Sequence, residues 1–239
     1  DVMAVDAKTG KMFWLYRYSN SGIQQVCCGA NNRGVAMLGD TLFMGTLDAH
    51  LVAIDAKNGK PLWNIAVADD KLAYSITLQP LIIKDTVIVG VGGGEYGIRG
   101  FVAAYNAHTG KELWRFYTVP GPGERGSETW SGDAASHGGG SVWVTGSYDP
   151  ALNLTYWGVG NPGPDWNPDQ RLGDNPHPDP VSSLVAHTGK LDGHCLFPPT
   201  DRSPYAPQPC PAPVLILPSR PPPCAAVWLT RTPFPPSPT

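Results

Sequence analysis

Two cysteines stand side by side in the stretch QQVCCGANNRG (residues 24–34), directly before a glycine and a polar loop. A usual disulfide joins residues whose Cα atoms lie about 5.5 Å apart, whereas a trans peptide holds neighbouring Cα atoms near ~3.8 Å. A bridge between Cys27 and Cys28 therefore closes only as a small strained ring, which is normally found where the surroundings enforce it, often at a ligand site. The alternative is a pair of free thiols that happen to be adjacent, and this stretch alone does not decide between them.

Three glycine-rich stretches carry an acidic, an aromatic and an amide side chain. GGGEYG (92–97) contains Glu95, GGGSVW (138–143) contains Trp143, and YWGVGNPGPDWNPDQRLGDN (156–175) contains Asn161. Glycines directly before a tryptophan favour close backbone approach to something flat. Taken singly, each residue has a plainer interpretation: a surface carboxylate, a turn residue before proline, and a tryptophan of the core.

The composition narrows the classes of protein to which the chain could belong. A net charge of −3 without a basic cluster offers no argument for a nucleic-acid partner. The five cysteines include no C-x-x-C pair, which argues against a structural zinc site. No apolar run approaches the ~18 residues needed to span a membrane. With 28 glycines, 26 prolines and 15% charged residues, the chain suits a turn-rich all-β protein of 239 residues.

A repeat of about 50 residues predicts the architecture. VMAVDAKTGKMFW (2–14) returns as LVAIDAKNGKPLW (51–63) and as VAAYNAHTGKELW (102–114), at intervals of 49 and then 51 residues. Each copy has an alternating apolar strand, a Thr-Gly or Asn-Gly hairpin turn and a tryptophan at fixed phase. Hairpins are also expected around Gly39-Asp40 and Lys84-Asp85. Four short strands per repeat is the pattern of a β-propeller blade, and the recurring tryptophan argues against the tandem hairpins of a sandwich.

The C-terminal part departs from this pattern. A fourth copy, SSLVAHTGKLDGHCLF (182–197), has Val185 at the aspartate position and Gly193 at the tryptophan position. Residues 194–239 hold 15 of the 26 prolines and no glycine, which disfavours further strands. We therefore expect about three blades in residues 1–175, a degraded continuation of the next blade in 176–217, and a non-homologous, disordered Pro-rich tail in 218–239. A frame-shifted translation is an alternative origin for the residues after about 176. At the other end, Asp1 already reads as part of a strand, so we expect the natural start of the protein to lie upstream.

Together these motifs resemble the pyrroloquinoline quinone (PQQ)-dependent alcohol dehydrogenases of the methanol and ethanol type. The resemblance is strong over residues 1–175, faint over 176–217 and absent over 218–239. It implies an eight-bladed propeller in which tryptophans dock between blades, and a periplasmic enzyme that oxidises a primary alcohol and passes electrons to a cytochrome c. A vicinal disulfide would also fit an oxidising compartment. The alternative is a non-catalytic propeller of the same repeat superfamily that serves as a binding scaffold.

The resemblance also implies a role for individual residues. Cys27 and Cys28 would form a vicinal disulfide against one face of PQQ, and Trp143 would stack on the other face. Glu95 and Asn161 would bind the calcium ion, with the remaining ligands coming from the cofactor. The expected contacts of PQQ with the rest of the chain involve Arg33, Thr77, Gly93, Gly94 and Ser141.

In the family that the chain resembles, an aspartate acts as the catalytic base, and the resemblance gives no aspartate at that position of this sequence. The stretch PTDRSPY (199–205) aligns with the motif that carries it, and the base position is Pro204. Asp201 matches an earlier aspartate of that motif. Ala206 stands where lanthanide-using relatives carry an additional aspartate, which favours calcium. We therefore expect a fragment or degraded copy of such an enzyme, one that does not turn over alcohol.

Overall fold

The all-β prediction is confirmed in the computed structural model, which describes residues 1–20, 26–124, 126–130, 132–164 and 180–196. Within these ranges the chain forms fourteen β-strands and four short 3-10 helices, and it contains no α-helix. No helix in the described part is long and apolar enough to cross a membrane. The expectations for Asp201, Pro204, Ala206 and the tail at 218–239 lie outside the described residues.

The strands form one two-stranded and three four-stranded antiparallel sheets, each in simple chain order. The first sheet contains β1 (Val2–Val5) and β2 (Met12–Tyr16). The second contains β3 (Ala36–Leu38), β4 (Thr41–Gly45), β5 (His50–Asp55) and β6 (Pro61–Ala66). The third contains β7 (Leu81–Ile83), β8 (Thr86–Gly90), β9 (Phe101–Asn106) and β10 (Glu112–Tyr117). The fourth contains β11 (Ser147–Asp149), β12 (Leu154–Gly158), β13 (Pro180–Val185) and β14 (Leu191–Leu196).

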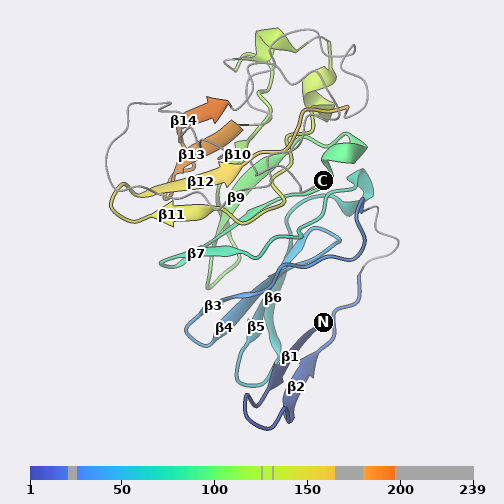
Figure 1. Ribbon diagram of the computed structural model, residues 1–239, viewed down its shortest axis with the longest axis vertical. Coiled ribbons are helices and arrows are strands. Elements are labelled where there is room, and N and C mark those ends of the chain that lie inside the picture. Colours follow the sequence, from blue (N-terminus) through green and yellow to red (C-terminus); the bar gives the residue numbers. More distant parts are fainter. Residues whose placement is uncertain (21–25, 125, 131, 165–179, 197–239) are drawn as a thin grey trace, which may run out of the picture.

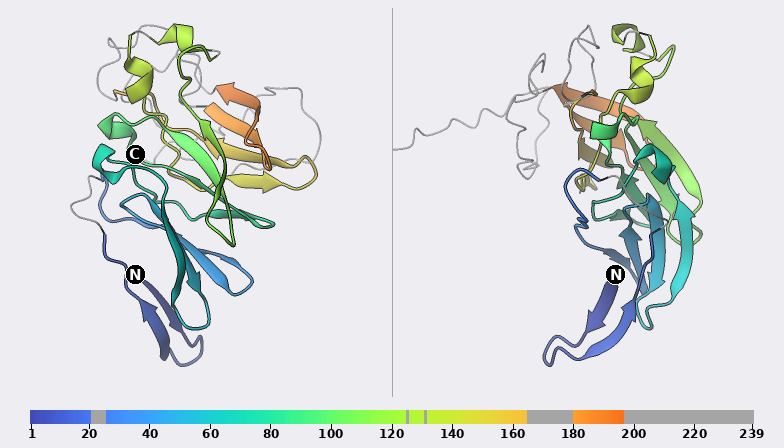
Figure 2. Two further views of the ribbon diagram at one scale, coloured as in Figure 1. Left: turned by 180° about the vertical axis from the view of Figure 1, so that it is seen from behind. Right: turned by 90° about the vertical axis from the view of Figure 1, so that its right-hand side faces the viewer.

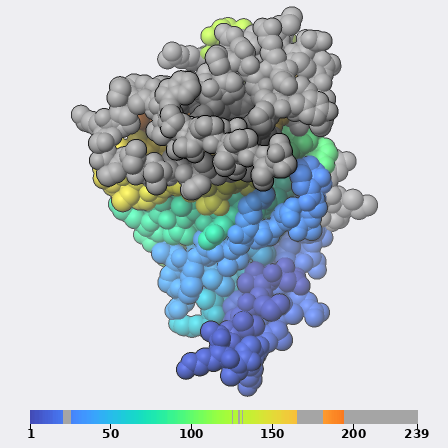
Figure 3. Space-filling view, in the orientation of Figure 1, coloured from blue at the N-terminus to red at the C-terminus, as the bar shows by residue number. Residues whose placement is uncertain are grey.

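The sheets follow one another as the blades of a partial propeller (Figure 1). Views from behind and from the side show the same succession of twisted sheets (Figure 2). In the space-filling view the N-terminal hairpin lies at one end and the next sheets form layers above it (Figure 3). Apolar side chains fill the space between the sheets, among them the fully buried Phe43, Ile88 and Phe101. Burial of this area is the main favourable term in the stability of the fold.

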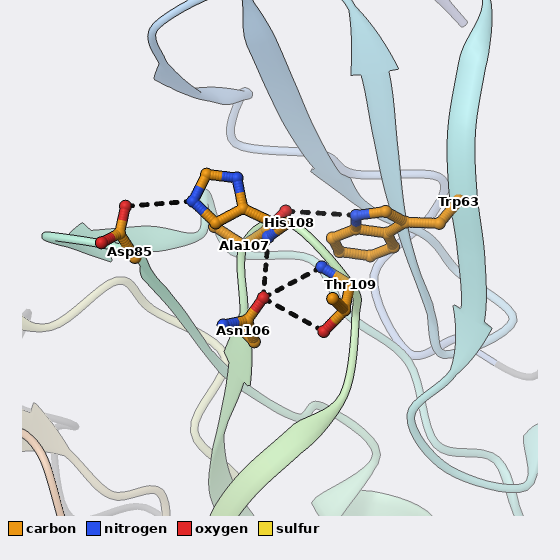
Figure 4. Close-up of polar contacts among 6 residues, drawn as sticks. All are labelled: Trp63, Asp85, Asn106, Ala107, His108 and Thr109. Atoms are coloured by element: carbon orange, nitrogen blue, oxygen red, sulfur yellow. Dashed lines mark hydrogen bonds and ion pairs between the residues drawn. The ribbon is translucent and has the colours of Figure 1, made fainter.

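The four copies of the sequence repeat become the hairpins β1–β2, β5–β6, β9–β10 and β13–β14. In the third copy the Asn106 side-chain oxygen accepts hydrogen bonds from the Thr109 backbone N–H (3.0 Å) and hydroxyl (3.1 Å), which closes the turn (Figure 4). Asp6 does the same in the first copy. In the fourth copy Val185 has no such oxygen, and the Gly189 N–H bonds to the Val185 carbonyl oxygen at 2.8 Å. The hairpin turn of the fourth copy therefore keeps its backbone hydrogen bond although the side-chain acceptor is absent.

Each repeated tryptophan joins its sheet to the next one. Its indole Nε1 donates a hydrogen bond to an alanine carbonyl in the hairpin turn of the following sheet. The three pairs are Trp14 to Ala56 (2.9 Å), Trp63 to Ala107 (3.1 Å) and Trp114 to Ala186 (3.2 Å). Figure 4 shows the Trp63 indole pointing at the Ala107 carbonyl. The indole ring also covers the turn glycine that follows this alanine, at Gly59, Gly110 or Gly189. We call this contact the tryptophan latch.

The fourth sheet combines β11 and β12, which precede residue 175, with β13 and β14, which belong to the degraded repeat after it. β12 pairs with β13 over five residue pairs, from Leu154↔Val185 to Gly158↔Val181. The degraded repeat therefore still supplies two strands, because a ladder needs only backbone donors and acceptors and an alternating apolar face. Gly193, on β14, offers no indole with which to form a further tryptophan latch.

Two turn glycines allow a matched test of the tryptophan latch. Gly59 has φ +72°, and an added Cβ would lie 2.5 Å from the Trp14 ring, whereas Gly10 has φ +70° and nothing within 4 Å. Both Gly59→Ala and Gly10→Ala impose the left-handed conformation on alanine, which costs about 1–2 kcal/mol. Gly59→Ala should cost about 1–3 kcal/mol more in free energy of unfolding, because it overpacks the latch. Urea unfolding followed by circular dichroism measures both, and equal losses would contradict the latch as a source of stability.

Candidate cofactor and metal site

The residues singled out in the sequence lie in connections at one end of the sheets. Arg33 belongs to the β2–β3 connection and Thr77 to the β6–β7 connection. Glu95 lies between β8 and β9, Trp143 lies between β10 and β11, and Asn161 follows β12. In antiparallel sheets of this order, alternate connections emerge at the same end. The topology therefore gathers segments that are far apart in the sequence.

Ser141 lies where two of these segments meet. An added Cβ at Gly94 would lie 2.9 Å from the Ser141 Oγ, and an added Cβ at Gly160 would lie 3.0 Å from the same atom. The Gly160 N–H donates to the Ser141 carbonyl oxygen at 2.7 Å. Ser141 is buried. Because Gly94 and Gly160 immediately precede Glu95 and Asn161, this one serine links the backbones that carry both candidate metal ligands.

Trp143 lies two residues further along and contacts the first two connections. The Arg33 guanidinium lies 4.9 Å from the centre of the Trp143 ring, within the range of a cation–π interaction. The Thr77 hydroxyl donates to the Trp143 carbonyl oxygen at 3.4 Å, and the Thr77 carbonyl accepts from the Arg33 N–H at 3.0 Å. The structure thus brings together three of the predicted cofactor contacts. It leaves Arg33 exposed, so its guanidinium is accessible to an anionic ligand.

The paired cysteines lie on the exposed part of the β2–β3 connection. The sulfur atoms of Cys27 and Cys28 are bonded at 2.17 Å, with the Cα atoms 3.8 Å apart. The Asn31 side chain donates to the Cys28 carbonyl oxygen at 2.6 Å, and the Asn32 side chain donates to the Gly45 carbonyl oxygen at 2.9 Å. The Asn31 contact lies within the cysteine turn, and the Asn32 contact ties the connection to β4 of the second sheet. The same connection then continues to Arg33.

Gly93 is a position that only glycine fits. Its φ is +113°, and a Cβ there would collide with the Ala73 carbonyl oxygen. Gly93 is also the N-cap of the 3-10 helix η2 (Gly94–Tyr96). The left-handed conformation turns the chain so that Gly94 faces Ser141 and Glu95 follows in an exposed position.

The available donors fit a hard cation only in part. Glu95 offers a carboxylate and Asn161 a half-buried amide, both of which are oxygen donors that Ca²⁺ accepts. Within the described residues, no three side chains among histidine, cysteine, aspartate and glutamate cluster as a metal site. A cation here would therefore depend on further oxygen ligands from another source, and a cofactor with carboxylate and quinone oxygens would supply them.

A network around Arg99, which the sequence analysis did not single out, supports the β10–β11 connection. The Arg99 Nε donates to the Val119 carbonyl oxygen at 2.9 Å, and its Nη2 lies 3.2 Å from Glu124. The guanidinium also stacks 4.0 Å from the Tyr117 ring. The Tyr74 hydroxyl donates to the Arg99 carbonyl oxygen at 3.0 Å, and burial raises the pKa of Tyr74, so this donor stays protonated at neutral pH. Only the position of Arg99 after the glycine-rich stretch could have drawn attention to it.

A hollow of about 270 Å³ lies close to this region, between η1 (Asp70–Leu72), η2 and η4 (Ala134–His137). Its lining includes Lys71, Tyr96 and His137 but none of the predicted site residues. Several of the predicted residues instead lie around Ser141 and Trp143, where the connections contact one another.

The comparisons with known proteins agree with the propeller fold and with the family that the sequence motifs resemble. Residues 1–195 match the family described as "PQQ: Glucose/ethanol/alcohol dehydrogenase, beta-propeller domain". The chain belongs to this family. The PQQ family match covers both the repeated hairpins and all of the predicted site residues.

Relatives within the family are similar at the level of both sequence and structure. The quinohemoprotein alcohol dehydrogenase ADH IIB of Pseudomonas putida is 45% identical, over 84% of this chain and 31% of its own length. A lanthanide-dependent methanol dehydrogenase of Methylacidiphilum fumariolicum is 39% identical, over 74% of this chain and 32% of its own length. The solved quinohemoprotein alcohol dehydrogenase from Comamonas testosteroni superposes with a TM-score of 0.73 at 33% identity, covering 81% of this chain and 32% of that one. The chain thus spans about a third of the length of these PQQ-family relatives.

Proposed function

We propose that this chain forms one side of a binding site for PQQ and a metal ion in an enzyme that oxidises primary alcohols. The convergence at Ser141 carries the proposal, because it brings the Glu95 and Asn161 segments to the same residue beside Trp143. Family membership supports PQQ as the cofactor, and the names of the relatives support an alcohol as the substrate.

The residues of the site would hold a flat, anionic cofactor in complementary ways. The Trp143 ring offers an aromatic face for stacking, and the bonded Cys27–Cys28 pair would limit the other side of the slot. The Arg33 guanidinium, whose Nη1 donates to the Thr77 carbonyl oxygen at 3.3 Å, would pair with a carboxylate of the cofactor. Thr77 and Ser141 offer hydroxyl groups, and Gly93 and Gly94 let the backbone come close. When bound, the quinone would supply hydride acceptance, with a metal ion as Lewis acid.

Glu95 and Asn161 are the proposed metal ligands, and we propose calcium as the metal. Both ligands are hard oxygen donors, and Ala206 offers no further carboxylate at the position where one would favour a lanthanide. Relatives that are named lanthanide-dependent make the lanthanide ion the competing outcome. The choice of metal therefore becomes part of the binding experiment below.

The whole enzyme would require a general base, an electron acceptor and an oxidising compartment. Proline at position 204 has no side chain that accepts a proton, so the proton of the alcohol would need another acceptor. We propose a cytochrome c as the electron acceptor and the periplasm as the location, which fits a chain with a bonded cysteine pair.

The first prediction concerns the state of the cysteines. If the chain is denatured without reductant and alkylated, the peptide that carries Cys27 and Cys28 should remain unmodified. After reduction it should gain two alkyl groups, which mass spectrometry detects. Cys27→Ser is the control, because it leaves Cys28 without its neighbour and open to alkylation. Alkylation of both cysteines before reduction would show two free thiols and remove one wall of the proposed slot.

The second prediction concerns the metal ligands. Glu95→Gln keeps the shape of the side chain but removes its charge, so uptake of PQQ in the presence of Ca²⁺ should weaken by at least about tenfold. Asp192→Asn, which changes an exposed carboxylate on β14, should leave uptake unchanged. Titration of PQQ followed by tryptophan fluorescence measures the affinity, with Ca²⁺ and a lanthanide ion compared in parallel. Equal affinities for Glu95→Gln and the parent chain would exclude Glu95 as a ligand.

The third prediction concerns turnover by this chain alone. With PQQ, Ca²⁺ and ethanol or methanol, reduction of an artificial dye acceptor should not exceed the rate without protein. A general base typically contributes a rate factor on the order of 10²–10⁴, and Pro204 contributes none. Turnover at rates normal for enzymes would contradict this expectation. Asp201→Ala would then test whether Asp201 serves as the base.

A further inference from the structure

Gly139 lies in a backbone crossing between the two segments that carry the candidate metal ligands. On one side, the Gly139 N–H donates to the Ile98 carbonyl oxygen at 2.9 Å, and the Gly100 N–H donates to the Gly139 carbonyl oxygen at 2.8 Å. These bonds form a parallel bridge between Arg99 and Gly139. They tie the crossing to the segment that continues from η2 and Glu95.

On its other side the crossing is bonded to the segment of Asn161. The Gly140 N–H donates to the Asn161 carbonyl oxygen at 3.0 Å, and the Gly163 N–H donates to the Gly138 carbonyl oxygen at 2.8 Å. An antiparallel bridge pairs Gly139 with Pro162. One residue thus belongs to two bridges, so the Glu95 and Asn161 segments share a common backbone neighbour.

The space around Gly139 leaves no room for a side chain on the Asn161 side. Its φ is +68°, and an added Cβ would lie 2.6 Å from the Gly163 nitrogen and 2.9 Å from the Asn161 carbonyl oxygen. Both of these atoms belong to the backbone, so neither moves without moving the segment that carries Asn161. Gly139 is itself buried.

We propose that Gly139 is a positioning residue that sets the distance of the Asn161 segment from the Glu95 segment. The proposal rests on the function proposed above, in which both residues bind one metal ion beside the cofactor. Any side chain at position 139 pushes the Asn161 backbone outward while the bonds to Ile98 and Gly100 hold the other side in place.

Two neighbouring glycines serve as matched controls. Gly140 has φ +63°, but its added Cβ would approach the Thr118 Oγ1 (2.8 Å) and the Val119 Cγ2 (3.1 Å), which are side-chain atoms away from Asn161. Gly123 has φ +81° and nothing within 4 Å of its added Cβ. Gly140→Ala therefore adds strain and crowding against Thr118 and Val119 at a residue whose N–H also donates to the Asn161 carbonyl oxygen, and Gly123→Ala adds the backbone strain alone.

The deciding experiment measures amide hydrogen exchange in this chain by NMR, without any ligand. Gly139→Ala should speed exchange of the Gly163 amide by at least about tenfold, while the Gly100 amide keeps its protection. Gly140→Ala and Gly123→Ala should leave the Gly163 amide within twofold of the parent, on the order of the scatter between independent sites. The proposal would be overturned if Gly139→Ala and Gly140→Ala changed the exchange rate of the Gly163 amide equally. It would also be overturned if Gly139→Ala reduced the protection of the Gly100 and Gly163 amides equally. If Gly139→Ala does not fold, Gly163→Ala approaches the crossing from the opposite side, with its Cβ 2.8 Å from the His137 carbonyl oxygen and 3.2 Å from the Gly139 nitrogen. It is judged by the Gly140 amide, which donates to the Asn161 carbonyl oxygen and should lose protection, and by the Gly100 amide, which should keep it.

A second measurement separates this proposal from the proposed function. Uptake of PQQ with Ca²⁺ should weaken at least about tenfold more for Gly139→Ala than for Gly123→Ala, as expected when support of a metal ligand is lost. Equal uptake by the two variants would overturn the positioning role. Absence of uptake by the unmodified chain would count against the proposed function, and the exchange experiment would still decide the role of Gly139.

Discussion

The hydrogen bond from a tryptophan indole to a carbonyl of the next sheet is the interaction on which the structure depends. The paired residues are 42, 44 and 72 positions apart in the chain, so each bond fixes a long-range contact. Its net contribution is about 0.5–1.5 kcal/mol, and the indole adds burial against the turn glycine. A glycine is needed beneath the ring because a Cβ would occupy the place of the indole. Repetition of this contact sets the spacing between successive sheets.

The candidate site inherits its geometry from that spacing. Its residues come from connections that involve all four sheets, and in the described residues none of these connections contains a regular helix or strand of more than four residues. They are positioned by the sheets that they join and by short backbone bonds to one another. Ser141 and Trp143 illustrate this. Ser141 contacts Gly94 in the third sheet's β8–β9 connection and Gly160 after β12 of the fourth sheet. Trp143 contacts the β2–β3 connection through Arg33 and the β6–β7 connection through Thr77. A shift between neighbouring sheets would therefore separate residues of the site.

The sequence predicted the parts of the fold that are periodic. The tryptophans at fixed phase and the Thr-Gly and Asn-Gly turns indicated a propeller, and the hairpins around Gly39 and Lys84 appear where they were expected. The acceptors of the tryptophan bonds were not predictable, because a backbone carbonyl leaves no mark in the residue type. The strands at 180–196 were also harder to foresee, since Gly193 and Val185 had removed the side chains that mark the repeat while the backbone pairing remained.

The same distinction applies to the site. Its residues could be proposed one by one from their resemblance to a family, but the meeting of Gly94 and Gly160 at Ser141 depends on the absence of two side chains in a folded chain. The cation–π contact of Arg33 with Trp143 likewise depends on a rotamer and on the packing of two connections. The role of Glu95 and Asn161 as ligands remains a prediction.

The crossing at Gly138–Gly140 has a consequence for how such proteins diverge. It is built from main-chain N–H and carbonyl groups, which every amino acid except proline provides, so its bonds do not depend on the surrounding side-chain types. Only the glycines themselves cannot drift, because each is held by a close neighbour or a left-handed backbone. Substitution of the surrounding side chains can therefore change the chemistry of the neighbouring connections while the backbone bonds that space them stay constant. The spacing of these connections and the chemistry of their side chains are thus set by different parts of the chain.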